Sequence, residues 1–103
     1  MEDLPDRSNL HGTLHTALER EAIVAAFVAS GWSMRRCGAA EYDLRTSFAE
    51  LVLESEHPFL IHGSVADIVA NAQRIADVLR AAAIAFVLEC YAEGGALIMQ
   101  LDA

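Results

Sequence analysis

The residues with the clearest potential for chemistry lie early in the sequence, where His11, His15 and Glu19 recur at intervals of four. On a helix this spacing would bring the three side chains to one face, where they could hold a metal ion. Gly12 weakens a helix, and Thr16 begins a capping pattern only after both histidines. We therefore expect neither a metal ion nor a cofactor in this segment.

A second candidate centre combines a thiol with imidazoles. Cys37 follows two consecutive arginines, whose positive charge could lower the pKa of the thiol. His57 and His62 could serve as bases, and Asp43 or Asp67 could orient one of them. No spacing links these residues, so the sequence favours a protein that is not an enzyme. The alternative is a small-molecule or metal binder, or an enzyme, that uses His57, His62 and Cys37.

Two other features have ordinary structural explanations. His62-Gly63-Ser64 is expected at a strand-to-helix turn, where backbone amides could bind an anion, but Ser64 as a helix cap accounts for the pattern. Cys90 lies in apolar sequence and is expected in the core, with no disulfide.

Two helices are expected to organise the chain. The first covers residues 16–30, from a capping box that begins at Thr16 to a stop at Gly31, with Trp32 placed to contact its last turn. The second covers residues 65–82 and carries its apolar side chains on one broad arc, which is typical of a helix lying on a sheet. Because the first helix is apolar on nearly every side, we expect a homodimer.

Residues 84–92 and 96–101 are predicted to form a hairpin that turns at Gly94-Gly95, since glycine adopts the positive φ of a tight turn. Pairing Glu93 with Ala96 fixes the register. The core face then carries an apolar set: Leu88, Cys90, Ala92, Leu97, Met99 and Leu101.

Between the helices we expect a strand over 32–37 and a hairpin of 48–55 with 59–63, turning at Glu56-His57-Pro58. A helix over 44–54 is the alternative, because Leu44, Phe48 and Leu51 also fit a helical stripe. With residues 1–15 read as a loosely ordered lead-in, residues 16–103 form a single α+β domain. Its predicted architecture is an antiparallel sheet of about five strands with two helices packed on it, in the order α-β-β-β-α-β-β.

Charge restricts the partners. Fifteen acidic residues against seven basic ones leave a net charge of −8, which disfavours nucleic acid and anionic membranes and favours a basic protein. All seven basic residues are arginine and alanine occurs nineteen times, a bias that suggests a GC-rich bacterial genome. The acidic start and the absence of a long apolar run predict a cytoplasmic protein.

The predicted binding surface is the sheet face opposite the core. An aromatic and aliphatic centre ringed by acids is typical of an interface. Its candidate residues are Glu50, Val52, Glu54, Glu89, Tyr91 and Ile98.

We therefore expect a small acidic, non-catalytic interaction module that binds a basic protein, as immunity proteins and inhibitors of basic toxins do. The order α-β-β-β-α-β-β is also similar to that of type III secretion chaperones. This resemblance implies a dimer and transfers no site residues.

Overall fold

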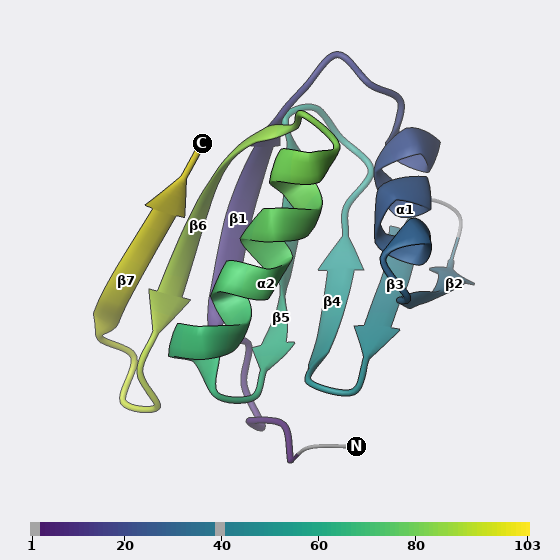
Figure 1. The fold of residues 1–103 in the computed structure, drawn as a ribbon. Helices are drawn as coiled ribbons and strands as arrows, with labels where there is room; N and C mark the ends of the chain where they lie inside the picture. Colours follow the sequence, from purple (N-terminus) through teal and green to yellow (C-terminus); the bar gives the residue numbers. More distant parts are fainter. Residues whose placement is uncertain (1–2, 39–40) are drawn as a thin grey trace.

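The computed structural model describes residues 3–38 and 41–103, in which one antiparallel sheet carries both helices on the same face (Figure 1). The strands of this described part are β1 (Leu10–His15), β2 (Ser33–Cys37), β3 (Glu41–Thr46), β4 (Ala49–Leu53), β5 (Phe59–Val65), β6 (Ala85–Tyr91) and β7 (Leu97–Asp102). The helices are α1 (Arg20–Ala29) and α2 (Ile68–Ala81). The α+β class is confirmed, but the sheet formed by the described residues has seven strands instead of about five.

β1 is the main departure from the predicted order. The strands lie in the order β2-β3-β4-β5-β1-β6-β7, so residues 10–15, expected to be a lead-in, form a strand inside the sheet. Leu10 and Leu14 are fully buried. Gly12 lies between them, where a Cβ would come within 2.6 Å of a side-chain carbon of Leu88. Gly12 occupies the core-facing position between Leu10 and Leu14, where the Leu88 side chain leaves no room for an apolar side chain. The glycine therefore hides the apolar alternation of this strand in the sequence.

A second unexpected strand, β3, precedes β4. Leu44 pairs with Leu51 across the two strands, which rules out the helical alternative over 44–54. The element order is therefore β-α-β-β-β-β-α-β-β. The order on which the similarity to type III secretion chaperones rested is wrong, and that similarity loses its basis.

Both helices begin later than predicted. The Thr16 hydroxyl accepts the N–H of Leu18 in a local turn instead of capping a helix, and α1 starts after Glu19. At its other end the prediction is confirmed: Gly31 has φ +94°, and the Trp32 N–H donates to the Phe27 carbonyl. The indole and phenyl rings meet edge to face with centroids 5.0 Å apart.

The predicted Ser64 cap of the second helix is also wrong, because β5 extends to Val65. Asn9 explains the extension: its side-chain amide donates to the Val65 carbonyl and accepts the Val65 N–H, at 2.9 and 2.8 Å. α2 then begins after Asp67, which adopts a left-handed conformation. Most of its predicted apolar arc is buried, including Ala72, Ile75, Ala76 and Leu79, but Val69 is exposed.

The β6–β7 hairpin keeps most of its predicted register. Cys90 pairs with Met99 and Leu88 with Leu101, as expected. The ladder then shifts, so that Leu97 pairs with Tyr91 instead of Ala92. This bulge adds a residue to β7 near the turn, and Leu97 lies exposed instead of in the core.

Within the described residues, no helix has the length and apolar character needed to cross a membrane.

Candidate protein-binding face

In residues 3–38 and 41–103, both helices lie on one face of the sheet and none lies on the other (Figure 1). Strand alternation sends the buried side chains toward α1 and α2 and the intervening ones to the opposite side, which we call the open face. The pairing register aligns a row of open-face side chains across all the described strands: Gln100, Glu89, His11, His62, Val52, Asp43 and Arg35.

The six predicted site residues all belong to this side of the sheet, but they fall into two groups. Glu50, Val52 and Glu54 lie on and just after β4, while Glu89, Tyr91 and Ile98 belong to β6 and β7. Because β5 and β1 separate β4 from β6, the groups are three strand spacings apart, or about 14 Å. The two predicted hairpins do share one sheet, but β1, which was expected to be part of a loosely ordered lead-in, lies between them.

Histidines occupy the space between the two groups. His11 on β1 and His62 on β5 are direct cross-strand partners, and their ring centroids lie 6.2 Å apart. His62 Nε2 lies 3.3 Å from a Glu54 carboxylate oxygen, and the His11 ring meets the Tyr91 ring edge to face at 5.6 Å. Ring contacts from His62 to His11 and from His11 to Tyr91 therefore link the β4 group to the β6 group.

The bulge in β7 shapes the apolar end of the open face. It sets Leu97 and Ile98 against a single residue of β6, Tyr91. Leu97 and Ile98 are 51% and 47% exposed and are adjacent in the sequence. Tyr91 and these two residues form an aromatic and aliphatic surface patch, which we call the anchor; tyrosine is among the residue types enriched at the energetic centres of protein interfaces.

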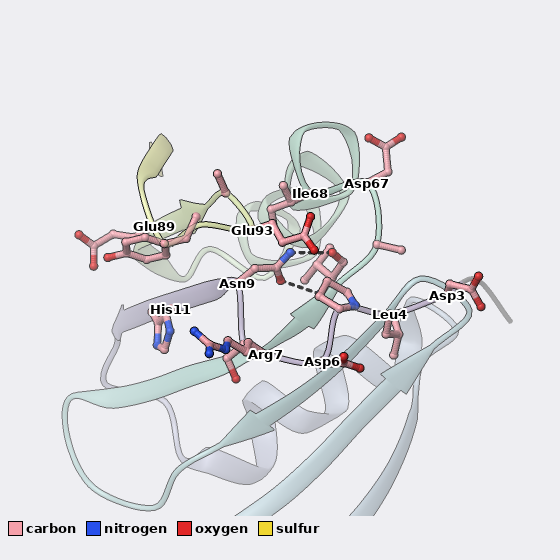
Figure 2. A pocket seen from close by; sticks show the side chains of 17 residues that line it. Asp3, Leu4, Asp6, Arg7, Asn9, His11, Asp67, Ile68, Glu89 and Glu93 are labelled. Carbon is pink, nitrogen blue, oxygen red and sulfur yellow. Dashed lines mark hydrogen bonds between the residues drawn. The ribbon is translucent and has the colours of Figure 1, made fainter.

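A groove of about 1190 Å³ begins beside this anchor (Figure 2). Its sides come from three segments: residues 3–9, the link from β5 into α2, and the end of β6 with its turn. Asn9 crosses the middle, where its hydrogen bonds to Val65 hold the amino-terminal segment against β5 (Figure 2). Arg7 lines the groove, but carboxylates outnumber it: Asp3, Asp6, Asp67, Glu89 and Glu93.

The proposed thiol centre has a different geometry from the one expected. The Cys37 thiol donates a hydrogen bond to an Asp43 carboxylate oxygen at 3.0 Å, and Arg35 donates to the same oxygen. The hydrogen bond to Asp43 raises the pKa of Cys37, more than the nearby arginine lowers it. The same bond lowers the pKa of Asp43, although burial acts in the opposite direction. Arg35 acts in the expected lowering direction, but the net shift is upward, so the expectation of a lowered Cys37 pKa is wrong.

The three residues of the alternative function are not brought together. Cys37 lies on the edge strand β2, and His62 on β5 is three strand spacings away, or about 14 Å. His57 stands in the β4–β5 turn with its ring 4.1 Å from that of Phe59, about 16 Å along the strand from His62. In the part of the chain that the structure describes, no three side chains of His, Cys, Asp or Glu form a group that could hold a metal ion.

The signal that could have identified β1 was its alternation of Leu10, Gly12 and Leu14 with His11, Thr13 and His15. Glycine at the middle apolar position hid it. Without β1, the pair of His11 and His62 could not be foreseen.

No family model, no curated protein and no solved structure matches this chain. The geometry of the open face is therefore the basis for a functional proposal.

Proposed function

We propose that the protein is a small acidic, non-catalytic interaction module that binds a basic protein partner on the open face. The proposal rests on the anchor of half-buried Tyr91 with exposed Leu97 and Ile98, beside a groove whose charged side chains are mostly carboxylates. Aromatic and aliphatic contacts of this kind slow dissociation, while surrounding charges speed the encounter. An inhibitor, an immunity protein or a chaperone of a basic protein would each use such a contact.

Charge supports this choice of partner. The molecule carries −8, and the carboxylates of the groove come from three separate segments that the fold brings to one place. A segment of a basic protein suits a groove of this charge, because its cationic side chains would find carboxylates on each of the three segments that line it. His11 and Tyr91 offer ring surfaces between these carboxylates, where a guanidinium can stack.

A titration with a synthetic peptide tests the proposal directly. The probe is a peptide of about eight residues that alternates arginine and valine, added to isotope-labelled protein and followed by backbone amide NMR signals. We expect the largest shifts at β1, β6 and the groove, and none with a peptide in which glutamate replaces arginine. Shifts that gather instead around Arg74 and Asp77, on the solvent side of α2, would place the site elsewhere.

Variants sharpen the assignment. Tyr91→Ala removes the aromatic anchor and should weaken peptide binding by about tenfold or more, chiefly through faster dissociation. Val69→Ala is the matched control, since Val69 is 56% exposed on the helical face. Equal affinity of both variants for the arginine peptide would remove Tyr91 from the site.

A further inference from the structure

The outer edge of β7 is open. Among the described strands, β7 is the last in the sheet and pairs only with β6. The Ala103 N–H points inward, donating to the Phe86 carbonyl at 3.2 Å, and N–H directions alternate along a strand. The N–H groups of Gln100 and Asp102 therefore point to the open edge, where an added strand would find them.

The two edges of the sheet differ in how they oppose such pairing. The opposite edge, β2, carries Arg35 and Arg36, and charged side chains on an edge strand discourage further strands. β7 has no charged residue before Asp102. In a protein of net charge −8, this neutral edge is where two copies can approach with least repulsion.

The sequence of β7 is also complementary to itself. An antiparallel pair centred on Gln100 sets Met99 against Leu101 of the second copy, and Asp102 against Ile98, so no carboxylate faces its own equivalent. Met99 and Leu101 are only partly buried where they pack against the core, and this pairing would cover both. The bulge at the start of β7 lies outside the central pairs of this register.

We infer that two copies of the chain join edge to edge through β7, antiparallel about a two-fold axis at Gln100, and so merge their sheets into one. The interface is isologous, with the same strand contributed by each copy. It leaves the open face uncovered, and therefore stands independently of the proposed function. It also gives the expected homodimer an interface other than α1.

Light scattering at about 10–200 µM protein tests the pairing. We expect a mass of twice 11.1 kDa for the wild type, and the dimer should tighten with added salt because the copies repel each other. Gln100→Lys places two like charges at the two-fold axis and should give a monomer. Ser33→Lys, the same charge on the opposite edge, should stay dimeric.

Cross-linking locates the contact. In a Cys37→Ser background, Gln100→Cys should be joined into dimers by a short bismaleimide, while Ser33→Cys should not. A wild-type monomer across the whole concentration range overturns the proposal. So does a dimer that Gln100→Lys leaves intact while Ala25→Glu, on the exposed side of α1, dissociates it.

Discussion

At the scale of single residues, Asp43 determines the chemistry of one edge of the sheet. Its carboxylate accepts hydrogen bonds from the Cys37 thiol and from Arg35, and Arg45 lies 3.7 Å from the same oxygen. A thiol that donates to a carboxylate is held in its protonated form, so the arginines do not make it a nucleophile. Cys37 is therefore a poor candidate for catalysis despite its basic neighbours.

Asp43→Asn should make Cys37 more reactive. Removing the carboxylate removes the main cause of the raised pKa and leaves Arg35, which acts in the lowering direction. We expect faster alkylation by iodoacetamide at pH 8 than in the wild type, measured by mass spectrometry. The buried Cys90 provides an internal reference, and an unchanged rate would contradict this account of Cys37.

The lowered pKa of Asp43 also predicts a pH dependence of stability. A carboxyl group whose pKa falls on folding stabilises the protein above its unfolded pKa of about 3.9, and loses that contribution as the pH falls through the folded value. The stability difference between wild type and Asp43→Asn should therefore be largest near neutral pH and shrink in acid. Urea unfolding at several pH values measures it, and a difference that grows in acid would show the sign to be wrong.

At the scale of elements, glycines mark where strands turn or approach closely. Gly95 has φ +93° in the β6–β7 turn, while Gly94 does not adopt a positive φ. A Cβ at either position would meet nothing within 4 Å, so backbone conformation alone separates them. Comparing the same substitution at Gly94 and at Gly95 therefore isolates the effect of φ.

Gly95→Val should destabilise the protein by about 1–3 kcal/mol, because a β-branched residue is strained at positive φ. Gly94→Val is the control and should change the melting temperature much less. Equal effects of the two substitutions would mean that the turn does not depend on the conformation of Gly95.

Gly63 serves a different purpose in the middle of β5. A Cβ there would collide with the Glu50 carbonyl oxygen, whereas the closest atom at Gly12 belongs to the Leu88 side chain, which can move. We expect Gly63→Ala to be more destabilising than Gly12→Ala, since backbone atoms cannot give way. Denaturant unfolding of both variants gives the order, and a reversed ranking would contradict the close approach of β4 and β5.

At the scale of the whole molecule, the net charge of −8 acts on two contacts in opposite directions. A basic partner is attracted and two copies are repelled. Salt screens both effects, so it should weaken the first contact and strengthen the second.

Charge reversal of the open face tests whether its carboxylates attract the basic partner at long range. With Glu50, Glu54 and Glu89 all changed to lysine, the arginine-valine peptide should associate more slowly and show a weaker salt dependence. Stopped-flow kinetics at about 50 and 500 mM salt measure both. Glu19, Glu21 and Asp77 changed to lysine, at the two helices, form a control with the same change in net charge; an equal effect there would show that only overall charge matters.

The sequence by itself determined the elements that local patterns encode. The α+β class, the end of α1 at Gly31, the buried arc of α2 and most of the β6–β7 register follow from apolar periodicity and glycine placement. It also indicated the open-face residues Glu89 and Tyr91, because strand alternation assigns sides without knowledge of neighbours.

Only the tertiary structure decided which strands meet. The position of β1 between β5 and β6 depends on long-range pairing. Gly12 takes the place of a core-facing side chain in β1 because the side chains of Leu88 and Ile61 pack close to it. The side-chain bonds of Asn9 that extend β5, and the contact of His11 with His62, likewise join residues more than fifty positions apart. Local propensity carries no information about such pairs, because their free energy arises only when the whole sheet has formed.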